Sequence, residues 1–134
     1  MPWQKEIKLA GGPQGCRPVT EEITRLIREG LNGVQGGTAT LHLFVTNPNA
    51  VLTVSGVVPN PTAVGEKLAT TLDVLFPGAE VTGPFTKASV VGPSLHIPIM
   101  GKALKLGPWQ QIYIIEFRTT GNNSPIPVVC TILP

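Results

Sequence analysis

Short segments in which apolar and polar side chains alternate constrain the fold of this 134-residue chain more than any other feature. Alternation with a period of two is typical of β-strands that bury one face. The 15 Gly and 14 Pro lie mostly between these segments, where they favour turns. Strands are predicted over residues 3–9, 38–46, 50–58, 95–100, 102–106, 111–120 and 126–133. Residues 11–18 and 31–37 are predicted to be loops.

Two segments instead place apolar residues at helical spacing. The first helix is predicted near residues 20–29, with Thr20 as its N-cap and Gly30 at its C-terminal stop. The second is predicted near residues 61–75, with Asn60 as its cap. Strands with two principal helices indicate an α+β fold with a largely antiparallel, two-layer β-sheet core.

Charge is sparse and evenly spread along the chain. Ten Lys and Arg against eight Asp and Glu give a formal net charge of +2, and charged residues make up 13%, about half of the usual ~25%. Because the basic residues do not cluster, we expect no nucleic-acid partner. A weakly charged, mildly hydrophobic chain favours an oligomer that hides surface. Uniform composition and length predict one domain, residues 1–134.

The chain carries no apolar run near the roughly 18 to 20 residues that span a bilayer. Its amino terminus lacks the apolar core of a signal peptide. We therefore expect no membrane partner and a cytoplasmic location. Cys16 and Cys130 are too far apart for a metal motif and are predicted to be free thiols.

Groups suited to catalysis are scarce. The carboxylates are one Asp, Asp73, and seven scattered Glu, whereas acid–base catalysis needs paired or closely placed titratable groups. His42 and His96 each lie between apolar residues of a predicted strand, and no metal-binding spacing accompanies them, which favours ordinary strand histidines. No nucleophile elbow, phosphate-binding lysine loop or dinucleotide motif occurs. We predict no catalytic residue, no metal ligand and no cofactor.

Three segments resemble a known family. LGPWQQIYIIEFRTTG (106–121) resembles L-G-T-W-Q-G-I-Y-L-x-E-F-R-x-x-G of the YjbQ-like proteins, small trimeric proteins linked to a thiamine-phosphate synthase activity. KASVVGPSLHIPI (87–99) is similar to K-S-S-L-L-G-x-S-L-x-I-P-I, and LHLFVTNPNAVLTV (41–54) to L-H-L-F-x-x-H-T-S-A-S-L-T-I. The resemblance covers nearly the whole chain and implies a YjbQ-like fold and a homotrimer.

The chain departs from that family at the groups that could transfer protons. Asn47, Pro48 and Asn49 stand where the family has His, Thr and Ser. A family carboxylate just downstream is absent, as is a second family His before Lys87, where Glu80 is the only acidic residue. Since an amide does not titrate near neutral pH, the comparison implies a site without acid–base chemistry.

The side chains that remain are implied by the resemblance to bind a ligand. They are Asn47, Lys87, Trp109, Gln110 and Arg118. A lysine and an arginine that converge on a pocket attract phosphate or carboxylate. Trp109 could equally be a packing residue at a strand start.

Glu116 and Arg118, two residues apart on one predicted strand, share a face and could simply pair with each other.

Three hypotheses follow. The first is a non-catalytic or altered trimeric protein with a pocket for a small anionic or phosphorylated molecule near its subunit interfaces. The second is an active thiamine-phosphate-synthase-like enzyme in which His42 or His96 replaces the absent imidazole. The third is a structural or interaction module whose pocket has filled with apolar side chains.

Each hypothesis predicts a different geometry. Clustering of His42, His96 and Glu80 favours the enzyme, whereas a cavity lined by Lys87 and Arg118 favours binding. Closure of the cavity by valines favours the structural module, and the candidates are Val51, Val57 and Val58.

Overall fold

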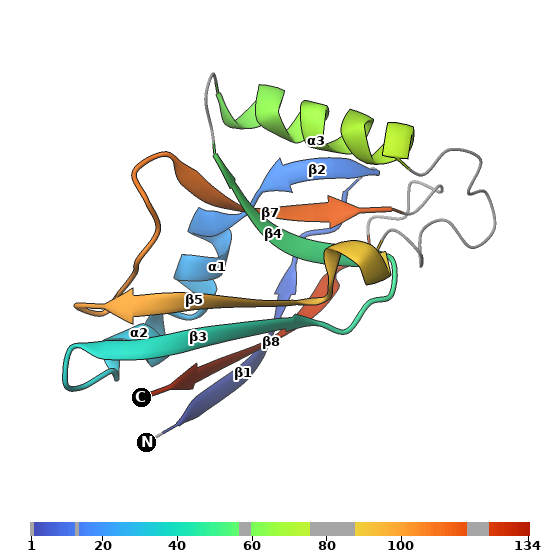
Figure 1. Cartoon of the computed structure of the whole chain (residues 1–134). Helices are drawn as coiled ribbons and strands as arrows, with labels where there is room; N and C mark the ends of the chain where they lie inside the picture. The colour runs from blue at the N-terminus through green and yellow to red at the C-terminus, as the bar shows by residue number, and fades with distance from the viewer. Residues whose placement is uncertain (1, 13, 57–59, 76–87, 118–123) are drawn as a thin grey trace.

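The strands of the computed structural model form two antiparallel sheets (Figure 1). The model describes residues 2–12, 14–56, 60–75, 88–117 and 124–134. The larger sheet has the order β1-β8-β3-β5-β6 and the smaller has the order β2-β7-β4. The bounds of the strands are β1 Trp3–Leu9, β2 Gly15–Pro18, β3 Thr38–Val45, β4 Ala50–Gly56, β5 Ser94–Met100, β6 Ala103–Leu104, β7 Gln110–Glu116 and β8 Ile126–Leu133.

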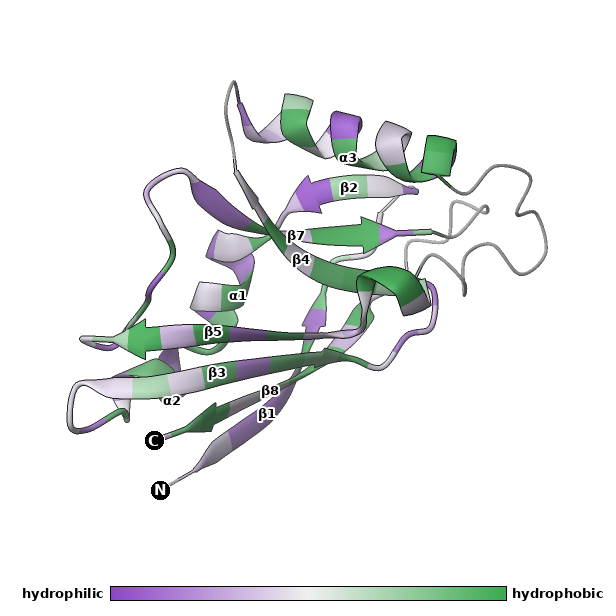
Figure 2. Ribbon diagram, viewed as in Figure 1, coloured by the Kyte–Doolittle hydropathy of each residue, from purple (hydrophilic) through white to green (hydrophobic). Residues whose placement is uncertain are grey.

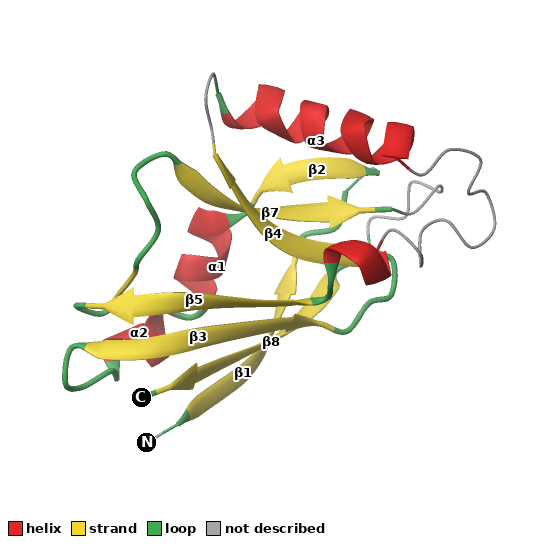
Figure 3. Ribbon diagram, viewed as in Figure 1, coloured by secondary structure: helices red, strands yellow, loops and turns green. Residues whose placement is uncertain are grey.

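Three helices and one helical turn complete the described fold (Figure 3). Their bounds are α1 Thr20–Leu26, α2 Arg28–Asn32, α3 Pro61–Leu75 and a turn at residues 88–91. The helix α3 runs along the three-stranded sheet, where the Tyr113 hydroxyl donates a hydrogen bond to the Pro61 carbonyl at 2.9 Å. The predicted α+β class and its antiparallel sheet core are confirmed.

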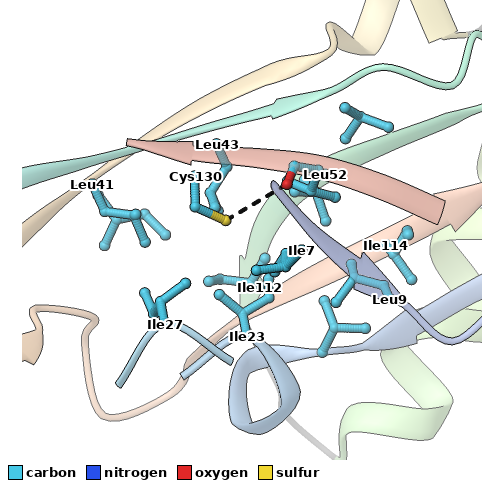
Figure 4. Packing of buried hydrophobic residues seen from close by; sticks show 14 of the residues in the cluster. Ile7, Leu9, Ile23, Ile27, Leu41, Leu43, Leu52, Ile112, Ile114 and Cys130 are labelled. Carbon is cyan, nitrogen blue, oxygen red and sulfur yellow. Dashed lines mark hydrogen bonds between the residues drawn. The ribbon is translucent and has the colours of Figure 1, made fainter. Parts of the chain in front are cut away.

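The main hydrophobic core lies between the two sheets and α1 (Figure 4). Leu41 and Leu43 from β3 contribute to one side of this core, and Ile112 and Ile114 from β7 to the other; all four are fully buried. Burying a side chain of this size contributes about 1.5–3 kcal/mol. The hydropathy colouring alternates along β3 and β5, as expected for strands with one covered face (Figure 2). Their intervening side chains therefore lie on the other face of the five-stranded sheet.

One predicted loop contains a strand. Gly15–Pro18 forms β2, which pairs antiparallel with β7. Glycine and proline at its two ends obscured this segment, although proline is tolerated in an edge strand. As a result, β2 places Arg17 beside Glu116 at the end of β7.

The first helix also differs from its prediction. Thr20 is not the N-cap, since Val19 holds that position without a side-chain cap hydrogen bond. The Thr20 hydroxyl instead accepts a hydrogen bond from the Ile112 N–H at 2.8 Å. The helix breaks at Ile27 and resumes as α2, so Gly30 does not end it. Gly30 lies against the Trp3 ring, where a β-carbon would come within 2.5 Å of the indole.

The predicted loop at 31–37 begins later than expected, because α2 extends to Asn32. The second helix agrees with its prediction. It spans Pro61–Leu75, and the Asn60 Oδ1 accepts a hydrogen bond from the Ala63 N–H at 2.9 Å. None of the helices in the described part of the chain has the length and apolar character needed to cross a membrane.

Candidate functional site

The Asn47-Pro48-Asn49 segment is a hydrogen-bonded bend that leads from β3 in one sheet to β4 in the other. The Asn47 Oδ1 accepts a hydrogen bond from the Asn49 N–H at 2.8 Å, and the Asn47 carbonyl accepts one from the Ala50 N–H at 3.3 Å. This is turn chemistry that asparagine favours. The Asn49 carbonyl also accepts the Phe117 N–H at 2.7 Å, which ties the bend to the end of β7.

A cavity of about 400 Å³ lies beside this bend, and we call it the bend pocket. It is lined by Phe44, Val45, Thr46, Asn47, Pro48, Ala50, Ala88, Ser89 and Pro93. Ala88 follows Lys87 in the chain, and Phe117, which binds the bend, precedes Arg118. Two segments that are far apart in sequence therefore line the cavity, and a third, the end of β7, is hydrogen-bonded to the bend. Lys87 and Arg118 themselves lie outside the described residues.

The bend pocket is mainly apolar, with a few polar groups at its wall. Because the Asn47 side-chain oxygen accepts a hydrogen bond within the bend, the side-chain NH₂ supplies the remaining donors. An amide donor can hold an acceptor atom of a ligand but cannot take up a proton at neutral pH. The geometry thus suits orientation of an acceptor group rather than catalysis of proton transfer.

A small cluster of buried apolar residues adjoins the bend pocket. It consists of Val51, Ala88, Ile115 and Phe117, and Ala88 also lines the pocket. Val51 is fully buried, so one of the valines expected to close the cavity does fill the interior. Val57 and Val58 lie outside the described residues. The cavity beside the bend nevertheless stays open.

Glu116, at the end of β7, is a carboxylate that is 1% exposed. It accepts a hydrogen bond from the Gly12 N–H at 3.1 Å and forms an ion pair with Arg17. The Arg17 guanidinium also donates to the Ala10 carbonyl. A buried carboxylate of this kind needs a charged partner and hydrogen bonds. Sequence reasoning missed Arg17, because only the pairing of β2 with β7 brings it here.

A second cavity, of about 310 Å³, lies between α3 and the end of β7. Glu116 and Asp73 are its acidic lining residues, and Ile115 and Phe117 line it as well. The end of β7 therefore lines the cavity beside α3 and is separate from the lining of the bend pocket.

Trp109 and Gln110 lie at the opposite end of β7 from Glu116. The length of this strand separates them by about 20 Å. The Gln110 Oε1 accepts a hydrogen bond from the Gly107 N–H at 2.9 Å, and Trp109 is 66% exposed. Within one chain, these two predicted ligand-binding residues are not brought together with Asn47.

His42 and His96 are directly opposite each other on β3 and β5. Their ring centroids are 4.6 Å apart, and the Phe44 ring is 6.5 Å from His42. Glu80, the third member of the predicted cluster, lies outside the described residues. In the described part of the chain, no group of three or more His, Cys, Asp or Glu side chains could hold a metal ion.

Both cysteines are free thiols, as predicted. Burial raises the pKa of Cys16 and of Cys130 to about 12 in each case. Because the thiolate is the reactive form, neither residue is activated as a nucleophile at neutral pH.

Comparisons with known proteins agree with this architecture. The family model of the UPF0047 protein YjbQ-like proteins matches residues 5–131. A UPF0047 protein YjbQ from Salmonella typhimurium is 33% identical over 138 residues, which cover 97% of this chain and 96% of the relative.

Solved structures show the same fold. A YbjQ-like protein of unknown function from Sulfolobus solfataricus superposes with a TM-score of 0.78 at 15% identity, over 99% of this chain and 97% of the other. An uncharacterised YjbQ/UPF0047 protein from Clostridium acetobutylicum gives a TM-score of 0.68 at 26% identity, over 98% and 99%. With a family model that matches almost its whole length, this chain belongs to the YjbQ-like UPF0047 family.

Proposed function

We propose that this chain is a non-catalytic or chemically altered YjbQ-like protein that binds a small anionic or phosphorylated molecule in the bend pocket. The observation that carries the proposal is that the bend at Asn47 and the turn that starts at Ala88 line one cavity, while Phe117, at the end of β7, donates a backbone hydrogen bond to the bend. Each segment adjoins or contains a residue that the sequence assigns to ligand binding.

The charge of the ligand follows from the neighbours of these segments. In the sequence, Lys87 adjoins Ala88, which lines the cavity, and Arg118 adjoins Phe117, which is hydrogen-bonded to the bend. If both cations reach the pocket, they favour phosphate or carboxylate oxygens, and the Asn47 amide adds neutral donors for the same oxygens. The apolar wall suits a ligand with an organic body as well as an anionic group.

The proposal includes a homotrimer. Phe44, Met100 and Leu133, on the five-stranded sheet, are 41%, 51% and 48% exposed. Burial of such side chains between subunits stabilises an assembly through the hydrophobic effect. In a trimer, Trp109 and Gln110 of one chain contribute to the pocket of the next, which accounts for their separation from Asn47 within one chain.

Equilibrium binding of inorganic phosphate, pyrophosphate and thiamine monophosphate tests the binding function. We expect at least one of them to bind, and Lys87→Ala and Arg118→Ala to weaken that binding, because each removes a cation that the proposal assigns to the ligand. Lys105→Ala is the matched control, since Lys105 is an exposed lysine away from the cavity. Equal binding by all three variants would remove the basis of the proposal.

The second candidate is an active enzyme that uses His42 or His96. The observation in its favour is the close approach of the two imidazoles, together with Phe44, which lines the bend pocket and whose ring centroid is 6.5 Å from that of His42. Thiamine-phosphate synthesis that His42→Gln or His96→Gln abolishes, in protein that remains folded, would support this candidate over the non-catalytic one.

A further inference from the structure

The two histidines of the chain form a cross-strand pair on the five-stranded sheet. His42 lies between Leu41 and Leu43, which face the core, so its ring projects from the opposite face. The antiparallel register places His96 directly opposite His42. Residues at such positions have β-carbons about 4.5–5.5 Å apart. The backbone of two paired strands therefore fixes the distance between the two β-carbons and keeps the imidazoles within reach of each other.

The separation of the rings fits chelation of one metal ion. The ring centroids are 4.6 Å apart and the ring planes are inclined by 48°. With metal–nitrogen bonds of about 2.0–2.1 Å, two imidazoles at adjacent positions of one ion have ring centres roughly 4.5–5 Å apart. We propose that His42 and His96 form a bidentate site for a divalent late transition-metal ion, of which Ni²⁺, Cu²⁺ and Zn²⁺ are the ions that imidazole ligands suit.

The surroundings of the pair are compatible with a bound cation. The neighbouring residues on the same face of β3 and β5 are Thr40, Phe44, Ser94 and Pro98, none of which carries a positive charge. Within one chain His42 is half-buried and His96 is exposed, which leaves the remaining coordination positions to water or to a group from a neighbouring subunit.

Across the pair on β8, Thr131 lies opposite His42, and its hydroxyl accepts a hydrogen bond from Gln4 at 2.9 Å. The Thr131 hydroxyl, opposite His42 on the neighbouring strand, is thus already engaged by Gln4. We therefore assign both protein ligands to imidazole nitrogens. Thr131 serves as the position of a control substitution.

Calorimetric titration of the untagged full chain with Ni²⁺ alone, at pH about 7.5, tests the site. We expect one ion per chain, and binding at least about tenfold weaker in His42→Gln and in His96→Gln, because each variant loses the effective concentration that chelation provides. The double variant should bind no better than either single one. Thr131→Val should bind Ni²⁺ as the unmodified protein does.

A second readout separates loss of the site from loss of the fold. Because the chelate joins β3 to β5, Ni²⁺ should raise the thermal unfolding midpoint of the unmodified protein and of Thr131→Val, but not of the histidine variants. Unchanged Ni²⁺ binding in either histidine variant, half the stoichiometry in each single variant, or no binding by the unmodified protein would each overturn the proposal. Phosphate binding by the histidine variants reports separately on the bend pocket.

Discussion

Glu116 shows at the scale of single residues how much a buried charge depends on its partner. Its side chain is inaccessible, whereas the Arg17 side chain is 32% exposed. Arg17→Met leaves the buried carboxylate without that guanidinium, and we expect a loss of about 2–3 kcal/mol of unfolding free energy. Glu116→Gln keeps an acceptor for the Gly12 N–H and leaves an arginine that is partly solvated. We therefore expect a smaller loss of unfolding free energy, about 1–2 kcal/mol.

Urea unfolding of the two single variants and the double variant measures these losses. In the double variant the loss should be smaller than the sum of the two, since both substitutions break the same pair. A larger loss for Glu116→Gln than for Arg17→Met would contradict this account of the pair.

Because its cysteine thiols are buried, the protein should lose unfolding free energy as the pH becomes alkaline. Burial raises the pKa of Cys130 from an ordinary 9.0 to about 12, so the folded state retains a proton that the unfolded chain releases. Its contribution is complete below pH 9 and is lost as the pH rises toward 12. Cys130→Ala should therefore reduce the fall in unfolding free energy between pH 8 and pH 10.5.

Val128→Ala is the matched control for this thiol. Val128 is also fully buried on β8 but carries no titratable group, so the variant should lose stability equally at both pH values. Burial also raises the pKa of Tyr113, which leaves some alkaline dependence in every variant. A Cys130→Ala protein with an unchanged pH dependence would refute the assignment.

Substitutions of Asn47 test the proposal that the protein is not a thiamine-phosphate synthase. Purified protein should show no thiamine-phosphate synthesis above background, and Asn47→His should not restore it. Catalytic groups that act as a unit are strongly non-additive, and the family carboxylate and second His are also absent. The measurement is product formation by the two proteins. Activity in the unmodified protein that Asn47→Ala removes, with the fold intact, would favour the enzyme instead.

The packing of α3 depends, at the scale of elements, on one glycine. A β-carbon at Gly65 would lie 2.6 Å from the Cys16 carbonyl oxygen, which belongs to the backbone of β2. Alanine at this position gains about 1 kcal/mol of helix propensity. We expect the steric clash to exceed this gain, with a net loss of about 1–2 kcal/mol.

Thermal or urea unfolding of Gly65→Ala measures the net effect. Thr71→Ala is the control on α3, because Thr71 is exposed and its substitution should change stability by less than about 0.5 kcal/mol. A stabilised Gly65→Ala protein would show that α3 can move away from β2 at little cost.

Assembly is the prediction that belongs to the whole molecule. Sparse charge and exposed apolar side chains on the five-stranded sheet favour a homotrimer. Light scattering coupled to gel filtration should give a mass three times the 14.2 kDa of one chain. Leu133→Glu, which places a charge among the exposed apolar residues of that sheet, should shift the protein toward smaller species if this face is buried between subunits. A monomer at micromolar concentration would contradict the prediction.

Elements with a local pattern can be predicted from the sequence alone. Alternation predicted β1, β3, β4, β5, β7 and β8, and the Asn60 cap with its apolar stripe predicted α3. These elements follow from side-chain periodicity and from hydrogen bonds between near neighbours. The family motifs likewise indicated the fold, since they extend along almost the whole chain.

Contacts between distant residues depend instead on how the strands pair in three dimensions. The short strand β2 has little pattern of its own and is held by β7, and that pairing brings Arg17 to Glu116. The register of β3 with β5 places His42 against His96, although 53 residues separate them in the chain. A shift of register by one residue would turn either ring to the other face of the sheet, so the local pattern of either strand alone does not specify the pair.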